Sequence, residues 1–183
     1  MKNSEFITGK VPITKEEVRA IVLSKLDIEN AKKFLDVGAG TGSVCIEAAL
    51  RNKNLNVTAI ERHEHAVELI NANKEKFDVK NVDVIEGYAP FRTEERYDAI
   101  FIGGTAKKLE EIIDWSYEIL NEGGKVCANF IILDTFYKAL EIFKNKKFKN
   151  IDVSMVSVSK LEKLGSGEYF KPQNPIFLIS AEK

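Results

Sequence analysis

Short apolar runs alternate with longer amphipathic segments through most of the chain. Such alternation is typical of a mostly parallel sheet whose two faces are covered by helices. The runs predict five strands, at residues 33–37, 57–60, 82–85, 97–102 and 125–132. The amphipathic segments predict helices beginning near residue 14 and running over 44–49, 64–77, 107–121 and 136–143.

Several local signals predict where these helices begin and end. Thr14 followed by Glu17 forms a capping-box pattern, so we expect Thr14 to cap the first helix. Asp134 is expected to cap the last helix. Gly123 and Gly124 are expected to end the helix before the fifth strand.

The pattern changes in the last part of the chain. Residues 153–158 and 175–180 predict two further strands, and Gly165 to Gly167 predicts a loop. Two strands with no helix between them indicate an antiparallel hairpin at the sheet edge. The predicted fold is therefore an α/β fold: a seven-stranded, mostly parallel sheet with one antiparallel edge strand and helices on both faces. The chain has no repeat, low-complexity segment or linker, so residues 1–183 are expected to form one domain.

Composition narrows the possible partners. The 183 residues include 27 Lys and Arg and 28 Asp and Glu, and this balance gives no whole-molecule attraction to nucleic acid. No apolar stretch is long enough to cross a membrane, and the N-terminal residues lack the apolar centre of a signal peptide. We therefore expect a cytoplasmic protein that binds neither nucleic acid nor membrane.

The cysteines and histidines do not suggest a metal site. Cys45 and Cys127 lie far apart in apolar runs, which favours buried free thiols over a disulfide or a metal pair. His63 and His65 are two residues apart, a spacing that points two side chains to different sides of a helix. No metal ligand is predicted.

A glycine-rich turn follows the first strand, in the sequence Asp36-Val-Gly-Ala-Gly-Thr-Gly42. Glycines allow a tight turn and let a ligand press against the backbone without Cβ collisions. The turn also directs backbone N–H groups and a helix N-terminus at whatever occupies the site.

Glu61 stands at the end of the second strand, nineteen residues beyond Gly42. An acid in this place can accept hydrogen bonds from the hydroxyls of an adenosine ribose, whereas the competing interpretation is a solvated charge at a strand end. The dinucleotide pattern needs Gly or Ala at position 43, where Ser43 stands, and no Gly-Lys-Ser/Thr follows to make a phosphate-binding loop. These residues favour a ligand that contains a nucleoside, and they fit neither the dinucleotide pattern nor a phosphate-binding loop.

The turn resembles motif I of the S-adenosylmethionine-dependent methyltransferases of Rossmann-like fold. In that family the turn contacts the amino-acid part and the ribose of the cofactor, and a hairpin follows the fifth strand at the sheet edge. The resemblance implies S-adenosylmethionine as the cofactor.

Segments outside the turn are similar to one branch of that family, the decarboxylating precorrin methyltransferases of cobalamin biosynthesis. The N-terminal block and the Gly103-Gly104 turn are the more specific parts of the resemblance, which covers nearly the whole chain. The matching segments are Glu5-Phe-Ile7, Val11 to Arg19, Asp36 to Ser43, Ala59 to Arg62, Glu86 to Pro90, Phe101 to Gly104 and Asn174-Pro175.

This resemblance implies methylation of ring carbon 15 of a precorrin or cobalt-precorrin tetrapyrrole, with decarboxylation of an acetate side chain. It implies that the N-terminal segment, residues 1–30, covers the cofactor and substrate. The implied cofactor contacts are Thr14, Gly38, Ala39, Gly40, Thr41, Gly42, Glu61 and Ala89. No catalytic residue is predicted, because the macrocycle itself delocalises the charge.

Two segments depart from the family pattern. Tyr88 stands where relatives commonly have Asp, so its ring or the backbone must contact the adenine. Residues 105–108, Thr-Ala-Lys-Lys, are less glycine-rich than in relatives.

A polycarboxylate substrate requires cationic side chains and backbone donors around the cofactor. Each candidate could equally be an ordinary feature, either a solvated surface charge or a turn glycine. The candidates are Lys10, Lys15, Arg19, Arg62, Lys107, Lys108 and Lys160, with Gly103, Gly104 and the loop from Gly165 to Gly167 as backbone donors.

The resemblance further implies a carbon-5 precorrin methyltransferase as a functional partner and assembly into a homo-oligomer such as a tetramer. An RNA methyltransferase is less favoured, because a net basic surface is lacking and Ile102-Gly103-Gly104 stands where the Asn-Pro-Pro-Tyr loop of amino methyltransferases would be. The sequence is also compatible with a methyltransferase acting on a different small molecule or on a protein, and with a non-catalytic cofactor-binding module.

Overall fold

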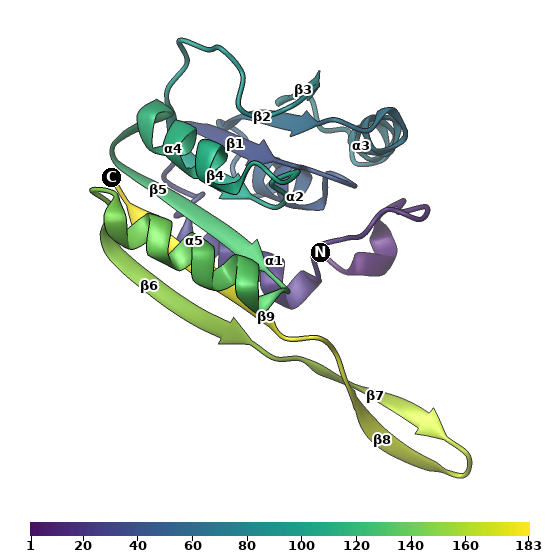
Figure 1. Ribbon diagram of the computed structural model, residues 1–183. Helices are drawn as coiled ribbons and strands as arrows, with labels where there is room; N and C mark the ends of the chain where they lie inside the picture. Colours follow the sequence, from purple (N-terminus) through teal and green to yellow (C-terminus); the bar gives the residue numbers. More distant parts are fainter.

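Seven strands form one sheet in a computed structural model that describes residues 1–183 (Figure 1). The strand order is β3-β2-β1-β4-β5-β9-β6, and β9 runs antiparallel to the other six strands. The predicted fold class is confirmed. The strands are β1 (Lys33–Val37), β2 (Asn56–Glu61), β3 (Val82–Glu86), β4 (Tyr97–Ile102), β5 (Leu120–Phe130), β6 (Lys149–Val156) and β9 (Ile176–Glu182).

Five α-helices cover the two faces of this sheet. Successive strand residues point to opposite faces, so Phe34 and Phe101 belong to one apolar cluster while Leu35 and Ile100 belong to the other. The first cluster packs beneath α1 and α2, and the second beneath α4 and α5. The helices are α1 (Glu16–Lys25), α2 (Ser43–Arg51), α3 (Glu64–Lys76), α4 (Leu109–Ile119) and α5 (Leu133–Asn145), and a 3₁₀ turn, η1 (Asn3–Glu5), precedes them.

The direction of strand addition reverses between β1 and β4. From β1 the chain first builds outward through β2 and β3, then returns to the other side of β1 with β4 and β5. In open parallel sheets, ligands bind outside the carboxyl ends of the strands at this switch point. The glycine turn after β1 therefore lies where a ligand is expected.

The hairpin predicted at the sheet edge is present, because β6 pairs antiparallel with β9. Between these strands the chain forms a second, two-stranded sheet that the sequence patterns did not predict. Its strands, β7 (Ser159–Leu164) and β8 (Gly167–Pro172), project from the body as an arm, and the predicted loop is the turn at the arm's tip (Figure 1). Nearly every residue of the arm is exposed. Its sequence therefore lacks the alternation of buried and exposed positions from which strands are predicted.

The capping predictions are wrong. Helix α1 begins at Glu16 with Lys15 at its N-cap, so Thr14 lies one residue too early, and no side chain caps the helix. The Thr14 carbonyl accepts a hydrogen bond from the Arg19 side chain. Helix α5 begins at Leu133, which places Asp134 inside its first turn, where an acid still suits the helix dipole.

The predicted boundary between the fourth helix and the fifth strand is also wrong. Helix α4 ends at Ile119, and β5 starts at Leu120, so Gly123 and Gly124 lie inside the strand. Gly123 has φ +75°, and the register of β5 against β4 shifts at this point. The two glycines therefore accommodate an irregularity of the strand.

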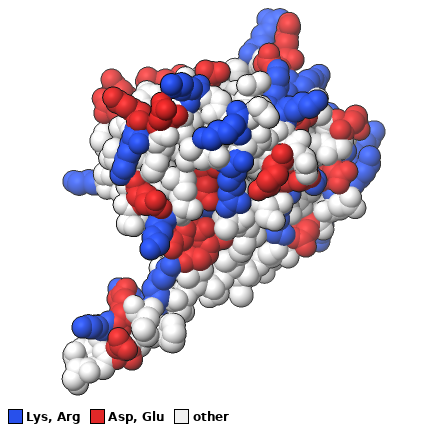
Figure 2. Space-filling model, turned by 180° about the vertical axis from the view of Figure 1, so that it is seen from behind, with Lys and Arg blue, Asp and Glu red and all other residues white.

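The surface agrees with the balanced charge of the sequence. Figure 2 shows Lys and Arg side chains interspersed with Asp and Glu over one face of the body. None of the helices combines the length and the apolar character that a membrane crossing requires. Cys45 and Cys127 are buried free thiols, as predicted.

Candidate functional site

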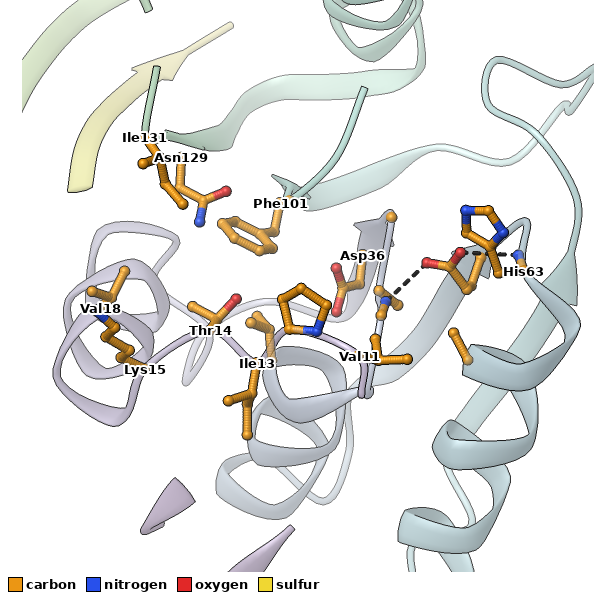
Figure 3. A pocket seen from close by; sticks show the side chains of 18 of the residues that line it. Val11, Ile13, Thr14, Lys15, Val18, Asp36, His63, Phe101, Asn129 and Ile131 are labelled. Carbon is orange, nitrogen blue, oxygen red and sulfur yellow. Dashed lines mark hydrogen bonds between the residues drawn. The ribbon is translucent and has the colours of Figure 1, made fainter. Parts of the chain in front are cut away.

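Two adjoining cavities open at the carboxyl ends of the parallel strands. The larger has a volume of about 840 Å³ and the smaller about 210 Å³, and Gly38, Glu61 and His63 line both (Figure 3). The larger cavity is also lined by the glycine turn, by the N-terminal residues 10–15, and by Phe101 and Asn129 of β4 and β5. The smaller is lined on its other side by residues 87–89 and Gly104.

The glycine turn connects β1 to α2 in a conformation that requires glycine. Gly38 has φ +73°, and a Cβ added there would lie 2.9 Å from the backbone of Gly104, which follows β4. The N–H groups of Gly38 and Ala39 both donate to the Ile60 carbonyl at the end of β2. The turn is therefore attached to both neighbouring strands.

Glu61 holds this turn from the end of β2. Its Oε2 accepts a hydrogen bond from the Gly40 N–H at 3.0 Å, and its Oε1 accepts from the N–H groups of Arg62 and His63 at 2.9 and 3.0 Å. A carboxylate offers about four acceptor positions, so about one position, on Oε2, is left for a ligand. Glu61 is thus buried and braced, and it is not a solvated charge at a strand end.

Asp36 is a second carboxylate in the wall of the larger cavity. It is buried, its Oδ2 accepts from the Cys45 N–H at 3.1 Å, and its Oδ1 has no hydrogen-bond partner. Burial raises the pKa of Asp36 to about 7; the Cys45 hydrogen bonds oppose this rise and the charge of Glu61 adds to it. A cation entering the cavity would stabilise the ionised form of this carboxyl group.

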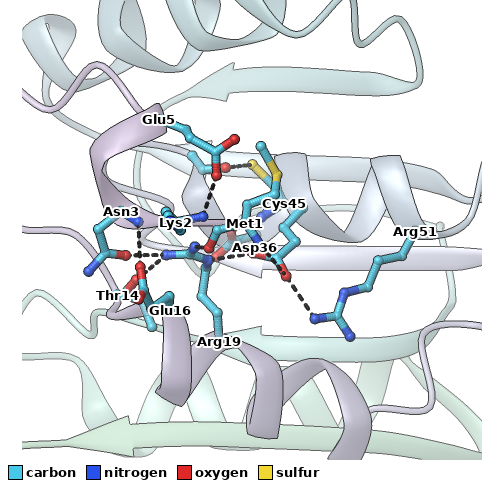
Figure 4. A network of polar contacts seen from close by, with 12 residues as sticks. Met1, Lys2, Asn3, Glu5, Thr14, Glu16, Arg19, Asp36, Cys45 and Arg51 are labelled. Atoms are coloured by element: carbon cyan, nitrogen blue, oxygen red, sulfur yellow. Dashed lines mark hydrogen bonds and ion pairs between the residues drawn. The ribbon is translucent and has the colours of Figure 1, made fainter.

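The N-terminal segment, residues 1–15, lines the larger cavity with its residues 10–15 and is held by the buried Arg19 (Figure 4). The Arg19 guanidinium donates to Glu47 Oε2 at 2.8 Å, to Asn3 Oδ1 at 2.8 Å, and to the carbonyls of Met1 and Thr14 at 2.7 and 2.6 Å. Each nitrogen of the guanidinium is engaged inside the protein. The prediction that Arg19 binds substrate is therefore wrong, because its charge is paired with Glu47.

Three of the remaining predicted cations line the cavities. Lys10 and Lys15 border the larger cavity. Arg62 borders the smaller one, where its guanidinium lies 5.7 Å from the centre of the Tyr88 ring. None of the three forms an ion pair, so their charges are free to meet a ligand.

The last three predicted cations lie elsewhere. Lys107 lines a separate depression between α4 and α5, and Lys108 precedes α4 without lining either cavity. Lys160 of β7 bonds to Glu16 and Glu17 of α1. These three positions are not brought to the cavities by the fold.

Some of the predicted cofactor contacts and backbone donors line the two cavities, and others lie away from them. Thr14, Gly38, Ala39, Gly40 and Gly103 line the larger cavity, and Ala89 and Gly104 line the smaller. Thr41 is buried within the turn, and Gly42 lies close to the side chains of Ile46 and Ile70, so neither residue lines a cavity. Gly165 and Gly167 lie at the tip of the arm.

Sequence reasoning missed several residues of the cavity wall. His63 and His65 both line the larger cavity, because His63 precedes α3 in an extended conformation and helical spacing does not apply to it. Asn129, whose Oδ1 has no hydrogen-bond partner, is a polar residue inside the apolar run of β5. The polar Asn129 within the apolar run of β5 is the sequence signal from which it could have been predicted.

Known proteins resemble this chain over almost its whole length. The precorrin methyltransferase domain family matches residues 6–183. The chain belongs to this family. A cobalt-precorrin-6B C(15)-methyltransferase (decarboxylating) of Salmonella typhimurium is 42% identical over 184 residues, which span 100% of this chain and 96% of the relative.

Solved structures give the same result. A precorrin-6y C5,15-methyltransferase from Geobacter metallireducens superposes with a TM-score of 0.93 at 37% identity, covering 100% of this chain and 97% of the other. The precorrin 8w decarboxylase of Methanobacterium thermoautotrophicum gives 0.90 at 27% identity, with both chains fully covered. A tRNA (m1A58) methyltransferase from Aquifex aeolicus, at 20% identity and a TM-score of 0.78 over 97% of this chain and 72% of the other, shares the fold alone.

Replacing Gly38 with alanine tests the glycine turn. The Cβ would both oppose the positive φ and meet the Gly104 backbone, so we expect Gly38→Ala to lower the free energy of unfolding by about 3 kcal/mol. Gly87→Ala is the control, because Gly87 has no atom within 4 Å of its Cβ position and should change stability by less than about 0.5 kcal/mol. Equal urea midpoints for the two variants would contradict the described turn.

The raised pKa of Asp36 predicts a pH dependence. Between about pH 4 and pH 7 the folded protein keeps the Asp36 proton that the unfolded chain releases, so this residue lowers the free energy of unfolding as pH rises. Asp36→Asn removes the titration. The unfolding free energy of the variant minus that of the wild type should therefore rise steadily from about pH 4 to about pH 7, measured by urea denaturation. A difference independent of pH would rule out the raised pKa.

Proposed function

We propose that this chain transfers a methyl group from S-adenosylmethionine to ring carbon 15 of a cobalt-precorrin or precorrin tetrapyrrole, with loss of the carboxyl group of an acetate side chain as carbon dioxide. The full-length match to the Salmonella typhimurium enzyme named for that reaction carries the proposal. The two cavities joined at Gly38 and Glu61 support the cofactor part of it.

The cavities suit the parts of an adenosyl sulfonium. We place the ribose against the free acceptor position of Glu61 Oε2, beside the backbone of the glycine turn. The adenine then lies in the smaller cavity, between Ala89 and the exposed ring of Tyr88, and the amino-acid part faces Asp36 in the larger cavity. The unpartnered Oδ1 of Asp36 supplies an acceptor for an ammonium group there.

When bound, S-adenosylmethionine supplies a methyl group that is already electrophilic, so alignment and exclusion of water are the main tasks of the protein. Residues 10–15 of the N-terminal segment line the larger cavity, and Phe101, Ile131 and Ile176 add apolar surface to its wall. The free cations Lys10 and Lys15 at its border suit the carboxylates of the tetrapyrrole.

No side chain is required as a base for the carbon–carbon cleavage. The bond between the acetate methylene and its carboxyl group breaks, carbon dioxide leaves, and the electron pair remains in the conjugated macrocycle. The protein has to hold the ring carbon in line with the methyl group and keep water out.

The arm formed by β7 and β8 supports the expectation of a homo-oligomer. A two-stranded hairpin alone is marginally stable in water, yet this arm leaves large apolar side chains exposed. Leu161 and Phe170 lie opposite each other in its register. We propose that these side chains are covered by another copy of the chain.

The methyl-transfer experiment uses isotope-labelled S-adenosylmethionine and a cobalt-precorrin-6B fraction, with mass analysis of the product. We expect the gain of one methyl group and the loss of one carbon dioxide. Glu61→Gln should weaken cofactor binding about tenfold or more, because one acceptor oxygen is lost. Cofactor binding without any turnover would favour a non-catalytic module, and methyl gain without carbon dioxide loss would exclude the decarboxylating reaction.

Sedimentation velocity tests the arm. Wild-type protein should sediment as an oligomer, and the double variant Leu161→Lys, Phe170→Glu should sediment as a monomer with unchanged secondary structure. The charge swap Glu162→Lys, Lys171→Glu serves as the control, because it changes two exposed residues of the arm while keeping the net charge and the ion pair between them. A monomeric wild type, or an unaffected double variant, would contradict this role of the arm.

A further inference from the structure

We propose that Asn73 is a positioning residue for the cofactor: its carboxamide fastens the N-terminal segment to the glycine turn, so that the cavity is complete before ligand enters. This inference rests on the proposed function, since it takes the larger cavity as the cofactor's site. Asn73 itself touches no part of either cavity.

Asn73 lies on α3 and is completely buried. Its Nδ2 donates to the Ile7 carbonyl at 2.8 Å and to the Thr41 carbonyl at 3.0 Å, and its Oδ1 accepts from the Ile7 N–H at 2.8 Å. One side chain thus satisfies both backbone groups of Ile7, as a neighbouring strand would. Ile7 is 40% exposed, so packing alone holds this residue only in part.

The cavity-lining stretch lies between two such attachments. Residues 7–15 form no helix or strand, so few backbone hydrogen bonds order them. Asn73 holds Ile7 at one end of the stretch. At the other end Arg19 holds the Thr14 carbonyl, as Figure 4 shows. Both attaching side chains are fully buried, where a lost hydrogen bond leaves an unsatisfied group.

The same carboxamide also fixes the opposite wall. Thr41, whose carbonyl it binds, lies between Gly40 and Gly42 in the turn. The two walls come close together here, since a Cβ on Gly40 would lie 3.5 Å from the Pro12 carbonyl oxygen. Asn73 therefore sets the position of the segment relative to the turn, and its loss should lower the fraction of molecules with a formed cavity.

Asn52 provides a matched control. It too is an asparagine whose Nδ2 bridges backbone carbonyls, those of Ile28 at 3.0 Å and Ala31 at 2.9 Å, but it lines neither cavity and joins no part of the site. Asn52→Ala and Asn73→Ala should both lower thermal stability. Only the change at Asn73 affects the segment over the cavity.

The experiment measures binding of S-adenosylhomocysteine by calorimetry, together with amide hydrogen exchange of residues 8–15. We expect Asn73→Ala to weaken binding about tenfold, because affinity falls with the fraction of competent molecules, and to speed exchange in this stretch. Asn52→Ala should leave both unchanged. If the two variants bind equally well, or equally poorly, the inference is overturned; if wild type does not bind, the proposed function fails instead.

If Asn73→Ala does not fold, a second pair of variants tests whether the hydrogen bonds between Asn73 and Ile7 support cofactor binding. Ile7→Pro removes the N–H that donates to Asn73, at a partly exposed position, while Ile7→Ala keeps it. The proline variant should bind S-adenosylhomocysteine more weakly than the alanine variant. Equal affinities of the two would contradict the role of Asn73.

Discussion

The hydrogen bond from the Gly40 N–H to the Glu61 carboxylate is the interaction on which the site depends. Parallel pairing of β1 with β2 brings the two strand ends to the same edge of the sheet. The carboxylate then joins the glycine turn to the start of α3, while the close approach of Gly38 and Gly104 joins the turn to the end of β4. Three strand ends are thus fixed around one ligand position.

Much of the fold could be predicted because its parallel strands are buried. Runs such as 99–102, Ala-Ile-Phe-Ile, read as continuously apolar, and the residues between such runs repeat with helical spacing. The arm could not be predicted in this way, since its exposed strands need no apolar face. The helix end predicted at Gly123 and Gly124 was wrong because glycines allow an irregular strand as readily as they end a helix.

The site was predictable where a backbone conformation demands a residue type, as in the glycine turn. It was not predictable where a residue's role depends on a distant partner. In the sequence Arg19 looks like a free cation, because its ion-pair partner Glu47 lies on another helix, α2. Asn73, on an amphipathic helix, gave no sign that its carboxamide would meet Ile7 and Thr41, which are remote in sequence.

A crystal structure of the chain with S-adenosylhomocysteine tests the central role of Glu61 most directly. We expect one sugar hydroxyl to donate to Glu61 Oε2 while that oxygen keeps its hydrogen bond from Gly40. We also expect the amino-acid part to face Asp36 beneath the N-terminal segment. A ligand whose sugar makes no contact with Glu61, or one bound outside the two cavities, would contradict this role.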